Sequence, residues 1–164
     1  MQIIISDASV LIDIEQAELI SAMFMLPYQF CVPDILFFEE LSERHDYLLE
    51  FGLDCRSMNG ELIAEAYHLR QQYVRPSVND LLALVLAKFE KCQLLTGDKA
   101  LRELANALGV EIHGTIWLVE QMILHQILSN DVAESAFHKM KEQGSRLPWD
   151  KVHNLLKKYD IYKS

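Results

Sequence analysis

Acidic residues occupy positions in this sequence from which they could reach a single site. In chain order these positions are Asp7, Glu39 or its neighbour Glu40, Asp80 and Asp98. Asp7 and Asp98 follow short apolar runs that suit buried strands, and the others lie in the first or second turn of expected helices. Because ligands of open parallel sheets bind beyond the carboxyl ends of the strands, carboxylates from four distant segments can converge there.

Carboxylates that gather at one edge of a sheet favour metal chemistry. Ionised carboxylates repel one another, and burial raises their pKa values unless a cation compensates. Mg²⁺ and Mn²⁺ prefer oxygen ligands, and such ions can activate water and stabilise the leaving oxygen of a phosphodiester. The acidic set therefore predicts a divalent-cation site suited to phosphodiester hydrolysis.

Each acidic residue also has a purely structural interpretation. Asp7 and Asp98 are good helix N-caps, and Asp80 stands three residues after Ser77, as in a capping box. Glu39 belongs to an acidic helix, for which a solvated face is the ordinary explanation. Capping does not explain why so many acids should share one edge, so both interpretations stay open at this point.

The elements that must position these residues alternate along the chain. Strands are expected over 2–6, 30–32, 53–58, 92–96 and 110–113. Helices are expected over 7–23, 36–48, 60–73, 77–89, 98–108, 115–128, 131–143 and 149–159. Strands separated by helices of this length are typical of a parallel sheet with helices on both faces. We expect a three-layer α/β/α domain over 1–130 with about five short parallel strands, and a helical extension over 131–164 packed on or beside it.

Composition and charge exclude several classes of protein. The 164 residues are 51% hydrophobic and 24% charged, which favours one globular domain over a disordered or fibrous chain. A net charge of −9 argues against a protein that coats nucleic acid by bulk electrostatics. The charge is −11 over 1–130 and +2 over 131–164, which together give −9. The basic end is either a differently charged solvated face or a surface that holds a polyanion near the acidic residues.

Other sequence features indicate a protein of a reducing compartment. The three cysteines, Cys31, Cys55 and Cys92, form no CxxC pair and are expected to be inert thiols. The N-terminal segment lacks the pattern of a signal peptide, and the longest apolar stretches fall short of the ~20 residues that cross a bilayer. No glycine-rich phosphate loop is present. We expect a cytoplasmic protein without a membrane partner.

Four segments of the sequence resemble a PIN domain, the family of metal-dependent ribonucleases that includes the VapC-type toxins of toxin–antitoxin pairs. In family order they are IIISDASVLID, VPDILFFEEL, SVNDLLALVLAKFEKCQLLTGDKAL and LGVEIHGTIWLVE, which span residues 2 to about 120. Each motif is short and common alone, whereas the ordered set is much more specific. The resemblance implies a flavodoxin-like layered fold and frequent homodimers.

The resemblance also implies roles for individual residues. The catalytic acidic residues would be Asp7, Glu39 (with Glu40 as the competing register), Asp80 and Asp98, of which the three aspartates would hold Mg²⁺ or Mn²⁺. The hydroxyls of Ser9 and Thr96 would support the site. The basic side chains expected to contact RNA phosphates are Arg70, Arg75, Lys99 and Arg102, helped by lysines and arginines of the extension.

Two functional hypotheses from different classes follow. The first is a metal-dependent endoribonuclease acting on single-stranded RNA, leaving 5′-phosphate and 3′-hydroxyl ends, in the role of a type II toxin with an antitoxin partner. The alternative is a standalone or non-toxin PIN-fold protein that acts as an interaction module. Its acidic pocket would bind a basic partner, since an arginine side chain matches carboxylates bidentately.

Overall fold

The computed structural model describes residues 1–160 and contains one parallel sheet. Its strands are β1 (Gln2–Ser6), β2 (Tyr28–Pro33), β3 (Asp54–Arg56), β4 (Gln93–Leu95) and β5 (Ile112–His113). Neighbouring strands pair in parallel in the order β3-β2-β1-β4-β5. The chain thus winds outward from β1 in one direction and then returns to place β4 on its other side. The expected five-stranded parallel sheet is confirmed.

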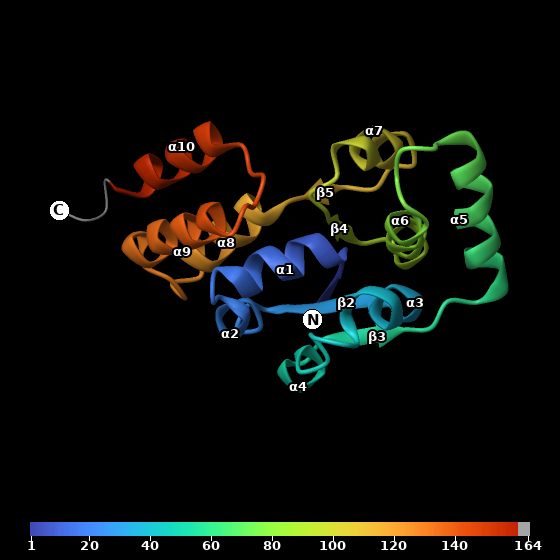
Figure 1. Ribbon diagram of the computed structural model, residues 1–164, viewed down its shortest axis with the longest axis horizontal. Coiled ribbons are helices and arrows are strands. Elements are labelled where there is room, and N and C mark those ends of the chain that lie inside the picture. Colours follow the sequence, from blue (N-terminus) through green and yellow to red (C-terminus); the bar gives the residue numbers. More distant parts are fainter. Residues whose placement is uncertain (161–164) are drawn as a thin grey trace.

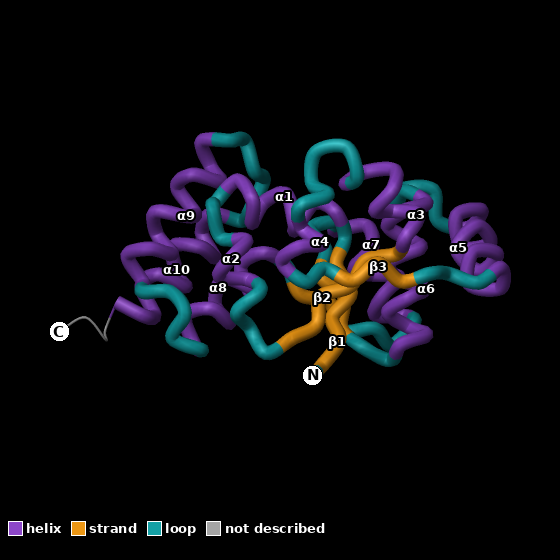
Figure 2. The backbone as a smooth tube through the Cα atoms, turned by 90° about the horizontal axis from the view of Figure 1, so that it is seen from below, coloured by secondary structure: helices purple, strands orange, loops and turns teal. Residues whose placement is uncertain are grey.

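Helices cover both faces of this sheet, which confirms the three-layer α/β/α arrangement (Figure 1). They are α1 (Ala8–Gln16), α2 (Ile20–Met23), α3 (Asp34–Leu36), the π-helical turn η1 (Phe37–Leu41), α4 (Leu48–Phe51), α5 (Gly60–Gln72), α6 (Val78–Glu90), α7 (Lys99–Ala107), α8 (Thr115–Leu124), α9 (Asn130–Glu142) and α10 (Trp149–Asp160). Helices α5, α6 and α7 lie on one side of the sheet, and α8, α9 and α10 lie on the other (Figures 1 and 2). No helix within residues 1–160 is long and apolar enough to cross a membrane.

The helix α6 is the central element of the core. Residues 81–87 are all buried, because the helix packs against β1, β2 and β4 on one side and α5 and α7 on others. A helix that is apolar all round is typical of a fully enclosed position. Its first turn, which carries Asp80, is therefore held rigidly relative to the sheet.

Two expected helices differ in extent from those in the structure. The helix expected over 7–23 ends at Gln16 and is followed by the separate α2, because Glu18 adopts left-handed backbone with φ of 59°. Leu19 N then donates to Ile14 O at 3.0 Å, which turns the buried Leu19 into the core. No glycine marks this break, so hydrophobic spacing alone continues through it.

The helix expected over 36–48 is also wrong as a single element. The chain forms α3 and η1, then a turn, and begins α4 only at Leu48. Ser42 N donates to Phe37 O at 2.8 Å, the wider spacing of a π-helical turn. π-helical turns are rare, and those that occur often lie near functional sites. Helical periodicity in a sequence does not predict them.

The last two helices pack against the rest of the molecule through α1 and α8. Ala136, Phe137 and Met140 of α9 are buried there. Two lysines of this region pair with acids of the main domain: Lys139 with Glu18 at 2.7 Å, and Lys158 with Glu120 at 3.4 Å. Part of the positive charge of the extension therefore neutralises acids of the main domain.

Candidate active site

The strands β1 and β4 lie side by side at the point where the order of the sheet reverses. Asp7 follows β1, and its backbone N–H donates to Leu95 O at the end of β4 at 2.9 Å. Thr96 Oγ1 donates to Asp7 Oδ2 at 2.6 Å and accepts from Asp98 N at 3.1 Å. One hydroxyl thus links two of the expected acidic residues. This reversal point is where ligands of open α/β sheets bind.

Asp7 is almost completely enclosed, with 2% of its surface exposed. Its carboxylate accepts from Val10 N at 3.0 Å, which makes it the N-cap of α1, and from Ser9 Oγ at 2.9 Å. Burial raises the pKa of Asp7, and the hydrogen bonds from Thr96, Val10 and Ser9 partly oppose this because they favour the charged form. Ser9 and Thr96 therefore contact Asp7 as supporting hydroxyls.

Asp98 is the N-cap of α7, and Asp80 is the N3 residue of α6, whose N-cap is Ser77. Ser77 Oγ accepts from Asp80 N at 3.1 Å and Ser77 N donates to Asp80 Oδ2 at 3.3 Å, which completes a capping box. Asp98 Oδ1 accepts from Ala100 N at 2.9 Å at the start of α7. The capping interpretation is confirmed for all three aspartates. A carboxylate that accepts a capping hydrogen bond can also belong to an acidic cluster at the edge of the sheet.

Asp7 and Asp98 lie near enough to Asp80 for their charges to act on it. Desolvation by burial, together with the negative charges of Asp7 and Asp98, raises the pKa of Asp80 to about 6, against hydrogen bonds from Ser77. The strand order explains this proximity, because β1 and β4 deliver two of the residues and α6 packs directly on both strands. Carboxylates from three distant segments therefore repel one another across a shared space.

The glutamate pair lies at the same edge and is connected by Asn79, a residue that the sequence analysis did not identify. Asn79 Nδ2 donates to Glu39 Oε2 at 2.9 Å. The pKa of Glu40 is raised by desolvation and by the charges of Asp7 and Glu39, and a hydrogen bond from Asn79 lowers it. The charges of Glu40 and Asp7 therefore interact. The only signal for Asn79 was its position beside Asp80.

No basic side chain of residues 1–160 forms an ion pair with any of these five acids. Within the same residues, no three acidic, histidine or cysteine side chains are close enough together to hold one metal ion. The donor set nevertheless fits a hard cation, because it consists of oxygen ligands whose mutual repulsion a divalent ion would relieve. Ionised carboxylates approach to ligand distance only when such a charge lies between them.

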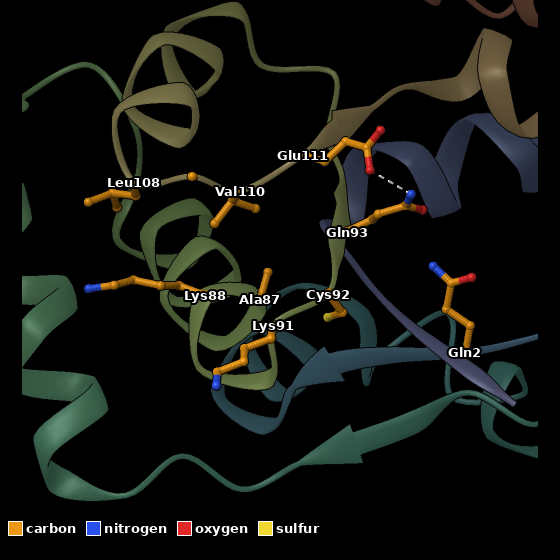
Figure 3. A pocket seen from close by; sticks show the side chains of 10 residues that line it. Gln2, Ala87, Lys88, Lys91, Cys92, Gln93, Leu108, Val110 and Glu111 are labelled. Atoms are coloured by element: carbon orange, nitrogen blue, oxygen red, sulfur yellow. Dashed lines mark hydrogen bonds between the residues drawn. The ribbon is translucent and has the colours of Figure 1, made fainter.

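Two hollows lie at opposite ends of the sheet. One, of about 410 Å³, adjoins the acidic residues and is formed by residues 72–76 and by 99, 100 and 103. The larger one, of about 500 Å³, lies where the strands begin, beside Gln2 and Gln93 (Figure 3). Its lysines, Lys88 and Lys91, extend away from those two glutamines (Figure 3). Lys88 Nζ pairs with Glu65 at 2.7 Å, so this lysine is neutralised within the chain.

The fold and the site define a doubly wound α/β protein with an acidic cluster where the strand order reverses. Residues 3–160 match the family described as DUF3368, a PIN domain, and the chain belongs to that family. PIN domains are in general nucleases that use divalent metal ions, so membership indicates a nuclease-type function. The match includes α9 and α10.

No curated protein is significantly similar to the chain. Among solved structures it is similar to a PilT N-terminus domain protein from the hyperthermophilic archaeon Sulfolobus solfataricus P2, with a TM-score of 0.48 and 15% sequence identity. That likeness covers 74% of this chain and 93% of the other.

Proposed function

We propose that this PIN domain is a metal-dependent endoribonuclease that hydrolyses phosphodiester bonds in single-stranded RNA. The observation that carries the proposal is the enclosed carboxylate of Asp7, which accepts from the same Thr96 hydroxyl that accepts from Asp98 N. The charges of Asp7 and Asp98 also help to raise the pKa of Asp80. No cation from residues 1–160 pairs with these groups. Unpaired carboxylates that are partly buried destabilise a fold, and such a cluster favours a site for a positively charged ligand.

In this proposal, individual residues bind the metal, position Asp7 or orient the attacking water. Asp7, Asp80 and Asp98 would hold Mg²⁺ or Mn²⁺, which when bound activates water and offsets charge on the phosphate. Thr96 Oγ1 orients Asp7 through its 2.6 Å hydrogen bond and favours the charged form of the carboxylate. Glu40, or Glu39 in the alternative register, would orient the attacking water and accept its proton.

We also propose that a protein partner binds to the same acidic cluster. A guanidinium group could hydrogen-bond to two of the unpaired carboxylates and would compete with a metal ion for them. An antitoxin with an arginine placed in this way would inhibit the nuclease, which is the type II toxin role. A second copy of the chain is the other protein partner that we propose.

The proposal is tested by cleavage of a pool of single-stranded RNAs with Mn²⁺ or Mg²⁺. Wild type is compared with Asp7→Asn, which keeps the shape of the side chain and removes its charge. Asp150→Asn, at an exposed position on α10, is the matched control. We expect EDTA and Asp7→Asn to abolish cleavage and Asp150→Asn to leave it unchanged.

Other outcomes separate the hypotheses. Cleavage that survives both EDTA and Asp7→Asn would contradict the metal mechanism. Mn²⁺ binding by calorimetry without cleavage of any RNA would favour the interaction module over the nuclease. Failure to bind Mn²⁺ at all would remove the basis for both the cofactor and the site.

A further inference from the structure

A hollow of about 410 Å³ lies beside the acidic cluster, between the connection from α5 to α6 and the start of α7. We name it the Tyr73 hollow; its walls include Tyr73, Arg75, Pro76, Lys99 and Glu103. The volume lies within the range of small-molecule pockets, which runs from roughly 300 to 1,000 Å³.

The walls of the Tyr73 hollow continue directly into the acidic site. Lys99 follows Asp98, and Pro76 precedes Ser77, whose hydroxyl caps α6 beside Asp80. The buried Pro76 fixes the backbone between the two regions. A polymer whose phosphodiester lay at the acidic residues would therefore have its neighbouring unit at the hollow.

The chemistry of the walls fits a nucleotide. Tyr73 is 42% exposed. Arg75 and Lys99 are exposed, and neither forms an ion pair within residues 1–160. This distinguishes them from Lys88, Lys139 and Lys158, which pair with acids of the chain. An exposed aromatic ring beside unpaired cations is the arrangement by which proteins bind single-stranded nucleic acid.

We propose that the Tyr73 hollow binds the nucleotide adjacent to the cleaved phosphodiester of a single-stranded RNA. The base stacks on Tyr73, and Arg75 and Lys99 contact the phosphates that flank it. This inference rests on the proposed nuclease function, and it assigns to that site a substrate-binding position outside the acidic residues. Of the four basic residues expected to bind RNA, the proposal assigns this role to Arg75 and Lys99, because Arg70 and Arg102 do not line the hollow.

Binding is tested with a 5′-fluorescein-labelled eight-nucleotide oligouridylate, measured by anisotropy on an Asp7→Asn background that prevents cleavage. We expect Tyr73→Ala to weaken binding about five- to 150-fold, the range for loss of one base stack, while Tyr73→Phe retains it. Arg75→Gln and Lys99→Gln should each weaken binding and lower the salt-dependence slope by about 0.7. Lys91→Gln, at the opposite hollow, is the charge-matched control and should change neither quantity.

Several results would overturn the inference. They are unchanged binding in all three hollow variants, an equal loss in Lys91→Gln, no binding by the parent protein, or displacement of the RNA by polyglutamate of equal charge. Thermal melts of each variant confirm that a loss of binding is not a loss of fold. Cleavage by wild type in Mn²⁺ is scored separately. Binding that depends on Tyr73 without cleavage would refute only the nuclease, whereas cleavage that ignores Tyr73 would refute only this binding position.

Discussion

The two ends of the sheet differ in how their polar groups are satisfied. Where the strands begin, Gln93 Nε2 donates to Glu111 Oε2 at 2.8 Å and Lys88 pairs with Glu65 at 2.7 Å. Where the strands end, Asp7, Asp80 and Asp98 gather without a cation from residues 1–160. Both ends have a hollow, and the larger one lies at the neutralised end.

Under the proposed function, this difference teaches that unsatisfied charge, rather than cavity size, marks the functional end of this molecule. Burying a carboxylate without a cation lowers the stability of the fold. Side chains that already form ion pairs or hydrogen bonds within the chain have few free charges or hydrogen-bonding atoms for a ligand. The acidic end carries an electrostatic cost that a bound cation would relieve.

The largest expected effect is on RNA cleavage, when one carboxylate is removed at each end of the sheet. We expect Asp98→Asn to lower kcat/KM for single-stranded RNA about 100- to 1,000-fold, as for loss of one preorganised charged group. Glu111→Gln, which retains a hydrogen-bonding partner for Gln93, should leave kcat/KM unchanged. Equal losses in the two variants, measured with the same RNA and Mn²⁺, would abolish the distinction between the ends.

A smaller effect should show which glutamate belongs to the acidic cluster. We expect Glu40→Gln to reduce cleavage about tenfold more than Glu39→Gln, because the charge of Asp7 helps to raise the pKa of Glu40. Asn79 contacts the pair, so Asn79→Ala is a useful companion variant and should reduce cleavage without changing Mn²⁺ stoichiometry. A larger loss in Glu39→Gln would restore the register preferred from the sequence.

The smallest expected effect is on stability, and its sign depends on pH. The pKa of Asp80 is raised from 3.8 to about 6 in the fold, so between these values the folded state holds a proton that the unfolded state has lost. Stability from this group is therefore lost as pH rises through that window, and the penalty is complete above about pH 6. Asp80→Asn should raise Tm by about 2–5 °C at pH 8 without metal, and by nothing at pH 4.

The amino end of the sheet provides the control for this stability effect. Glu111 is not part of a cluster of buried acids, so Glu111→Gln should not raise Tm at either pH. Calorimetric melts in EDTA measure both variants under the same conditions. A lower Tm for Asp80→Asn at pH 8 would mean that the capping box with Ser77 outweighs the relief of charge repulsion.

Much of the fold could be predicted from local patterns. The runs that became β1 and β4 are too apolar for exposed strands, and the seven consecutive buried residues of α6 were already a continuous apolar run. Capping chemistry at Asp7, Ser77 and Asp98 was also readable, because a cap and its helix are adjacent in sequence.

Other features depended on contacts that no local pattern encodes. The break at Glu18 has no glycine, and the π-helical turn at Phe37–Leu41 has no characteristic spacing. Asn79 contacts Glu39 across 40 positions of sequence, so its role appears only when α6 and η1 are packed together. The Tyr73 hollow likewise requires α7 to lie against the connection that precedes α6.

The sequence by itself determined which residue types follow each strand, because apolar alternation and helix caps are local properties. Only the tertiary structure decided that these residues meet. Residues 7 and 96 are 89 positions apart, and their 2.6 Å hydrogen bond exists because β4 pairs with β1 rather than with β3. The burial that raises the pKa of Asp7, and the neighbouring charges that help raise that of Asp80, arise from this pairing and from the packing of α6 on it. Charge repulsion and desolvation depend on distance in space, which the order of residues along the chain does not specify.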